Sequence, residues 1–187
     1  MVWHMLHFSD LQRQPLYVQL LSFAGAYLDS AETLCLNLCS NAVSSNYAHG
    51  AVVMSLTFHS LELFFKAGIL KVLPKERFAG KAGHDLDALA KRFFKLYPKK
   101  EFQFEVPFRD EPVVVVGGLS SDELATLRSH AEDYKRRVPE DQRHRYPTDG
   151  HGKSWPGAFG FEPSSFVPVL KELQSVYARV RPLLHAS

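Results

Sequence analysis

The sequence predicts an all-α fold, an up-and-down bundle of about five helices with a small β-hairpin insertion. Apolar residues recur every three or four positions along most of the chain, which is typical of amphipathic helices. Residues 51–73 are apolar almost throughout, as expected of a helix that is buried on every side. Residues 101–117 instead alternate between apolar and polar, which predicts two short strands. Because no repeat or low-complexity linker divides the chain, we expect a single domain over residues 1–187.

The first two predicted helices form an antiparallel hairpin. Residues 15–42 have an apolar stripe that steps by three and four positions from Leu20 to Leu38. Turn-forming residues follow, ending at Asn46, and a second helix is predicted from Tyr47 to about Leu73, directly before Pro74. Two long helices that are joined by a short turn pack side by side.

Three shorter or later helices complete the prediction. Asp85 is expected to cap a helix over residues 86–97. Ser120 and Glu123 have the spacing of a capping box, which predicts a helix from there to about Arg137. A final helix is predicted from Pro163 onwards. Residues 139–162 between them form a long irregular segment, and such segments inside a compact domain are usually functional or disordered.

Composition and charge exclude several classes of protein. The chain has 187 residues, 45% of them hydrophobic and 22% charged, so we expect an ordinary globular protein. A net charge of +2 is too small to indicate nucleic-acid binding by itself. Residues 1–10 lack the basic start and apolar run of a signal peptide, and Glu62 and Lys66 argue against a membrane span in the apolar stretch. We therefore expect a cytoplasmic protein that does not contact the membrane.

Polar residues inside the second predicted helix mark the main candidate site. His59, Glu62 and Lys66 share one side of this helix, and buried ionisable groups need partners. Partners are expected at the start of the third helix and in the irregular segment. The predicted polar cluster contains His59, Glu62, Lys66, His84, Asp85, Arg145 and Tyr146. One interpretation is a structural network that fixes the helices, in which Arg145 pairs with a carboxylate such as Glu62. The other is a ligand-binding or proton-transferring pocket.

The irregular segment is the second candidate site. It interleaves basic and aromatic side chains, a combination that suits phosphates and stacked bases. These residues are Arg143, His144, Arg145, Tyr146, His151, Lys153 and Trp155. We expect neither a metal nor another cofactor, because no carboxylate–histidine pair is repeated on a second helix as a di-iron bundle requires.

Three stretches together resemble the HEPN family of small helical-bundle domains: FHSLELFFKAGIL at residues 58–70, HDLDAL at 84–89 and RYPTDG at 145–150. The resemblance covers most of the chain, from about residue 17 to 185. It implies an up-and-down bundle of four to five helices that is often a homodimer. Many members of the family are metal-independent ribonucleases of toxin, phage-defence or RNA-processing systems. Others bind nucleotides or act as interaction modules.

The ribonucleases of this family carry an arginine and a histidine on a late helix, with four to six residues between them. The arginine would hold the scissile phosphate while the histidine exchanges protons with the ribose 2′-hydroxyl. Two pairs match the spacing: Arg179 with His185 on the last predicted helix, and Arg145 with His151 in the irregular segment. Val180 departs from the family pattern, in which a polar residue usually follows the arginine.

Two functions follow as expectations. The first is a HEPN-like helical interaction or ligand-binding module, a homodimer that binds a nucleotide or RNA. The alternative is a metal-independent HEPN-type endoribonuclease of a toxin or defence system. The sequence leaves open whether the protein is an enzyme.

Overall fold

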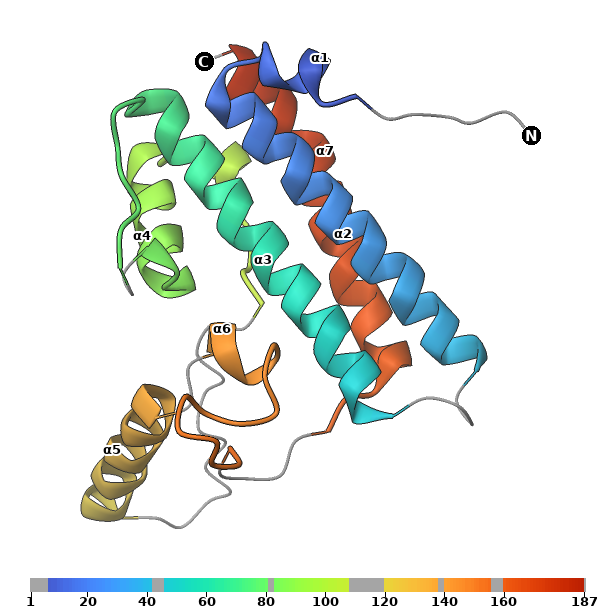
Figure 1. Ribbon diagram of the computed structural model, residues 1–187. Helices are drawn as coiled ribbons and strands as arrows, with labels where there is room; N and C mark the ends of the chain where they lie inside the picture. The colour runs from blue at the N-terminus through green and yellow to red at the C-terminus, as the bar shows by residue number, and fades with distance from the viewer. Residues whose placement is uncertain are drawn as a thin grey trace.

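The computed structural model describes residues 7–41, 46–80, 83–107, 120–137, 140–155 and 160–186, and its secondary structure there is helical (Figure 1). This confirms the predicted all-α class. The helices are α1 (Ser9–Gln12), α2 (Leu16–Ser40), α3 (Tyr47–Val72), α4 (Leu86–Leu96), the 3₁₀ helix η3 (Lys100–Phe102), α5 (Ser121–Arg137), α6 (Glu140–Arg143) and α7 (Pro163–Ala186).

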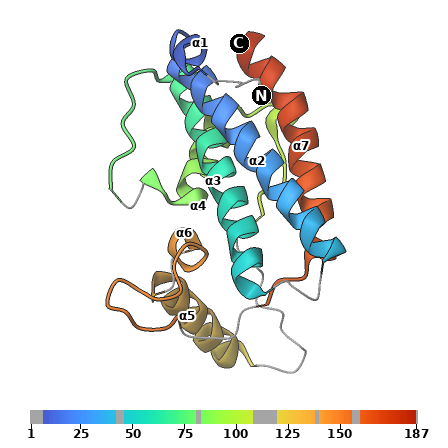
Figure 2. The same ribbon diagram turned by 45° about the vertical axis from the view of Figure 1, so that its right-hand side comes forward.

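Helix α3 is the central element, with α2 and α7 on one side and α4 on the other (Figures 1 and 2). The predicted hairpin of α2 and α3 is confirmed. A buried hydrogen-bond chain joins the three long helices: Ser60 donates to the carbonyl of Ala24 at 2.6 Å, and the hydroxyl of Tyr177 lies 2.9 Å from that of Ser60. Since Ser60 has only one proton, Tyr177 is the donor in the second bond.

Aromatic rings fill the space between α3, α4 and α7. Phe64 stacks on Tyr177 with ring centroids 4.2 Å apart, and Phe65 stacks on Phe104 at 5.8 Å. Phe93 of α4 is fully buried and packs against Phe64 and Phe65. Such contacts stabilise aromatic pairs beyond the burial of their area.

The predicted helix starts are confirmed by their caps. The side chain of Asn46 accepts from the backbone N–H of Ala48 at 3.0 Å, and Asp85 accepts from that of Ala88 at 3.0 Å. Glu123 accepts from the backbone N–H of Ser120 at 2.8 Å, as a capping box requires. These bonds satisfy N–H groups that a helix start otherwise leaves unpaired.

The β-hairpin predicted for residues 101–117 is not confirmed. In the part that the structure describes, residues 100–102 form η3 and residues 103–106 lie outside any strand. Phe102 and Val106 are nevertheless buried while Glu105 is exposed. The alternation therefore reflects one apolar side packed on the core, including Phe104 on Phe65, and not pairing with a second strand. The predicted second strand, residues 113–116, lies outside the described residues.

A bundle of five helices is not confirmed either. Helices α2, α3, α4 and α7 pack together, whereas α5 lies beyond them beside α6 in both views (Figures 1 and 2). The residues described in α5 are mostly exposed, so this helix contributes little to the core.

Helix α3 also meets, by length and composition alone, the requirement for crossing a membrane. Within its apolar window 72% of the residues are buried inside the protein, and core helices of soluble proteins meet the same requirement. The burial of α3 among α2, α4 and α7 accounts for its apolar character.

Gly68 is predicted to be a packing requirement of this core. A Cβ atom there would lie 2.6 Å from Cδ2 of Phe93, whereas at Gly25 the nearest atom is the flexible end of Arg181 at 3.3 Å. Gly68→Ala should lower the free energy of unfolding by about 1–3 kcal/mol through overpacking. Gly25→Ala, also inside a helix, should be neutral or gain up to about 1 kcal/mol from helix propensity. Urea denaturation of both variants measures this, and equal midpoints would contradict the packing argument.

Candidate functional site

The side chain of Glu62 lies in the middle of α3 and is only 1% exposed. One carboxylate oxygen, Oε1, accepts two hydrogen bonds. Lys66 Nζ donates from one turn further along α3 at 2.6 Å, and Nδ1 of His84, just before α4, donates at 3.1 Å. Because His84 directly precedes the Asp85 cap, Glu62 fixes the start of α4 against the centre of α3.

The other carboxylate oxygen of Glu62, Oε2, is buried and accepts no hydrogen bond. The nearest basic atom is Nδ1 of His59 at 3.8 Å, which is an ion-pair distance and too long for a hydrogen bond. A buried acceptor without a donor costs about 1–3 kcal/mol, and more when the group is charged. The cluster is therefore not a completely satisfied structural network.

Glu62 is ionised despite its burial. Burial alone would raise the pKa of this carboxyl, but His59, Lys66 and His84 together outweigh it and lower the pKa to about 2. Lys66 acts through both its hydrogen bond and its charge, and His84 through its charge.

Arg145 reaches the cluster from the segment that follows α6. Its guanidinium nitrogen Nη2 lies 3.4 Å from Nδ1 of His59. Because a guanidinium only donates, Nδ1 accepts, and the proton of a neutral His59 is on Nε2. Tyr27 of α2 packs against the same ring in an edge-to-face arrangement, with centroids 4.6 Å apart. Three segments distant in sequence thus meet at His59.

The basic groups lie between the buried carboxylate and solvent. The side chain of His84 is 49% exposed and that of His59 is 29% exposed, whereas that of Lys66 is 11% exposed. Arg145 is exposed. Lys66 and Arg145 carry two positive charges against the one negative charge of Glu62, so the cluster is net positive even with both histidines neutral.

The structure changes the membership of the predicted cluster. His59, Glu62, Lys66, His84 and Arg145 meet, and we call these five residues the Glu62 cluster. Asp85 does not join them, since its carboxylate caps α4. Tyr146 is 59% exposed, and its carbonyl accepts from the indole N–H of Trp155 at 2.7 Å.

The partner of Arg145 also differs from the sequence-based expectation. Arg145 contacts His59 and not the Glu62 carboxylate. Tyr27 lies within the apolar stripe predicted for residues 15–42, and nothing in that pattern indicates its contact with His59.

Neither predicted arginine–histidine pair is brought together by a contact within the part of the chain that the structure describes. Arg179 donates to the carbonyl of Gln103 at 3.2 Å, while His185 packs against Tyr17 of α2. Six residues along a helix rotate a side chain to about 120° from the first, so the two do not share a face. His151 lies in a turn where its backbone N–H donates to the carboxylate of Asp149 at 2.9 Å.

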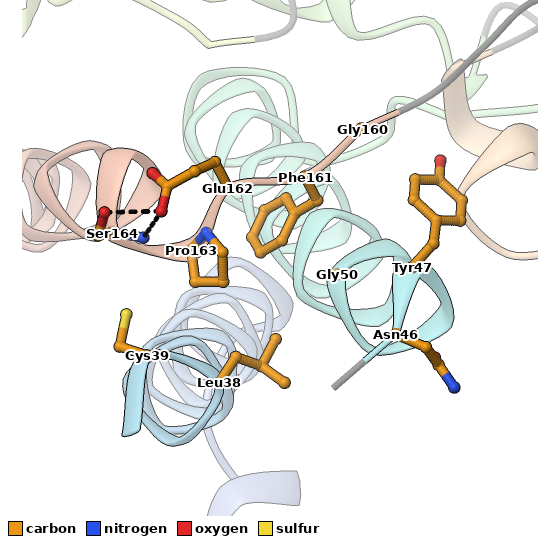
Figure 3. A pocket seen from close by; sticks show the side chains of 10 residues that line it. All are labelled: Leu38, Cys39, Asn46, Tyr47, Gly50, Gly160, Phe161, Glu162, Pro163 and Ser164. Atoms are coloured by element: carbon orange, nitrogen blue, oxygen red, sulfur yellow. Dashed lines mark hydrogen bonds between the residues drawn. The ribbon is translucent and has the colours of Figure 1, made fainter. Parts of the chain in front are cut away.

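A pocket of about 490 Å³ lies elsewhere, between the end of α2 and the starts of α3 and α7 (Figure 3). Phe161 lines it and packs against Gly50. Glu162 places a carboxylate in this pocket. The carboxylate accepts hydrogen bonds from Ser165 and Ser164, which lower the pKa of Glu162 to about 2. Since this carboxylate caps α7, the pocket offers little free polar chemistry, and the Glu62 cluster is the better candidate site.

Comparison with known proteins identifies no relative. No family model, no curated protein and no solved structure matches this chain. The residues described also contain no group of three or more His, Cys, Asp or Glu side chains that could hold a metal ion. The HEPN resemblance thus stays a prediction from three sequence stretches.

The ionised state of Glu62 predicts a specific pH dependence of stability. Its folded pKa of about 2 lies below the ordinary value of 4.5, so the stabilisation is present above about pH 4.5 and is lost as pH falls towards 2. The difference in pKa corresponds to about 3 kcal/mol. Glu62→Gln should therefore destabilise the protein near neutral pH, and the loss should shrink in acid. The exposed Glu172→Gln serves as control in the same urea titrations; a loss with Glu62→Gln that does not change with pH would contradict the assignment.

Proposed function

We propose that this protein is a HEPN-like helical module that binds a phosphate-bearing ligand, a nucleotide or RNA, at the Glu62 cluster. The observation that carries the proposal is one buried, ionised carboxylate surrounded by two lysine or arginine cations and two part-exposed imidazoles. If the cluster served only to satisfy Glu62, one or two basic partners would be enough. The additional basic groups supply a positive surface on which an anion can bind.

The chemistry of these side chains suits phosphate oxygens. Lysine, arginine and protonated histidine form charge-assisted hydrogen bonds to phosphate, which are shorter and stronger than neutral ones. The buried carboxylate holds Lys66 and His84 in place before a ligand arrives, so less side-chain freedom is lost on binding.

Aromatic side chains beside the cluster support a nucleotide over inorganic phosphate. Tyr146 follows Arg145 directly in the chain and is 59% exposed. The indole of Trp155 is anchored to the Tyr146 carbonyl, which holds the two rings in one short segment. An exposed aromatic ring next to a cationic group, as Tyr146 is beside Arg145, is a usual platform for stacking bases.

The homodimer, the cytoplasmic location and the five-helix arrangement belong to the same proposal and rest on the HEPN resemblance. Leu16 and Phe23 are exposed apolar side chains two turns apart on one side of α2, and they offer a surface that a second copy would cover. Sedimentation analysis of the purified chain gives its oligomeric state directly.

The alternative is the metal-independent endoribonuclease, and one contact favours it. Arg145 and His59 bring a guanidinium and an imidazole within 3.4 Å although they are far apart in sequence. Such a pair can hold a phosphate and transfer a proton.

Binding is tested by fluorescence polarisation with a labelled short RNA. Arg145→Ala removes one cation of the cluster and should weaken binding at least about tenfold. Lys171→Ala, which removes an exposed cation from α7, should leave the affinity unchanged. The proposal is wrong if the unmutated protein does not bind, or if both variants lose affinity equally.

Cleavage is tested by incubating the same RNA with the protein in the presence of a chelator. A binding module should leave the RNA intact. Cleavage that disappears in His59→Ala, while His151→Ala and His185→Ala remain active, would instead establish the ribonuclease with His59 at its centre. Loss of cleavage only in one of the other two variants would assign the activity to the corresponding predicted pair.

A further inference from the structure

We infer that the Glu62 cluster takes a terminal phosphate monoester, and that His59 gains a proton and exchanges Arg145 for Glu62 as the phosphate binds. This inference rests on the proposed function and specifies both its ligand and its pH dependence. The ligand class is the phosphate of a nucleoside monophosphate or of a phosphorylated nucleic-acid end.

The basic groups are gathered around one residue, Glu62, and so lie close enough together to contact one phosphate group. Lys66 and His84 both contact Oε1 of Glu62, at 2.6 and 3.1 Å, and His59 lies 3.8 Å from Oε2. Arg145 is held 3.4 Å from that same His59. Proteins that follow a nucleic-acid backbone instead spread their cations along a groove.

The charge of the cluster favours a dianion. A terminal phosphate has a second pKa near 6 and carries close to two negative charges at neutral pH, with three acceptor oxygens, whereas a backbone diester carries one. Lys66 and Arg145 minus Glu62 leave one positive charge, and the two histidines can add two more. A dianion therefore gains more than a monoanion from protonation of the imidazoles.

His59 lies between two competing partners. Its Nδ1 accepts from Arg145 at 3.4 Å, which requires an unprotonated Nδ1, and the same atom lies 3.8 Å from the orphaned Oε2 of Glu62. When Nδ1 carries a proton it can no longer accept from a guanidinium, but it can donate to Oε2. A small movement of the ring would then give this buried oxygen the donor that it lacks.

The groups around His59 set the direction of the coupling. Glu62 of α3 favours the imidazolium, while Lys66 of α3, His84 when charged and Arg145 oppose it, and Tyr27 of α2 covers the ring without charge. A bound phosphate draws Arg145 to its own oxygens and adds negative charge beside the ring. Both changes favour a proton on His59, so binding of phosphate and uptake of a proton support each other.

Calorimetry with adenosine 5′-monophosphate and its methyl phosphodiester tests the ligand class. The two probes share the nucleoside and differ in one phosphate charge. At about pH 7 the monoester should bind at least about tenfold more tightly. A short RNA with and without a 5′-phosphate is titrated as a second pair of probes. If the phosphorylated RNA binds more tightly than adenosine 5′-monophosphate, the ligand is a nucleic-acid end. If these two bind equally, the ligand is the free nucleotide.

Proton uptake is measured on the unmutated protein by repeating the titrations in buffers of different ionisation enthalpy. The binding enthalpy should vary with the buffer in the sense of uptake. Between about pH 7 and about pH 8.5 the phosphate stays dianionic, so the expected fall in affinity reports the protein. His59→Gln should abolish both effects, and His7→Gln, which replaces an exposed histidine near the N-terminus, should retain them.

The outcomes separate this inference from the proposed function. If neither the adenosine probes nor the RNAs bind, the proposed function fails. If both adenosine probes bind equally and Arg145→Ala weakens both, the proposed function stands and the terminal-phosphate inference is overturned. If the monoester is preferred but the enthalpy does not depend on the buffer, the exchange at His59 is overturned.

Discussion

The ionised carboxylate of Glu62 inside α3 determines how the groups around it are arranged. Removing a charge from water is unfavourable, and it is tolerated only where the partners are close and well oriented. Lys66 supplies one partner from the same helix, and His84 supplies the other from the start of α4. The carboxylate therefore helps to determine how α4 packs on α3, and it places basic groups between the core and solvent.

The same arrangement connects stability with the proposed binding. A carboxylate at the surface would compete with an incoming anion, whereas a carboxylate beneath the basic groups orients them and stays out of reach. The price of this design is the orphaned oxygen Oε2. His59, which accepts from Arg145, lies 3.8 Å from this oxygen, and the inferred exchange would turn its ring from one partner to the other. Such an element can respond to ligand and to pH.

Local signals in the sequence were sufficient for the helices and for naming the five residues of the Glu62 cluster, although not for the contact between Arg145 and His59. Asp85 and Asn46 mark helix starts because their side chains bond backbone N–H groups nearby, and His59, Glu62 and Lys66 share a side at helical spacing. The contact of Arg145 with His59 spans 86 residues, and no local pattern encodes it. The predicted β-hairpin was not confirmed because alternation of apolar and polar residues shows which side of a segment is buried. It does not show whether a second strand pairs with that segment. The spacing of Arg179 and His185 likewise matched the family pattern but carried no information on what each side chain contacts.

The most direct test of the central claim is the protonation of His59 and His84 in ¹⁵N-edited histidine NMR spectra, recorded near neutral pH with and without adenosine 5′-monophosphate. In the free protein, His59 should show the neutral form with its proton on Nε2. Saturation with the nucleotide should convert it to the imidazolium, with a proton on Nδ1 facing Glu62. Spectra in which both histidines keep their chemical shifts at saturation would contradict a phosphate site at the Glu62 cluster.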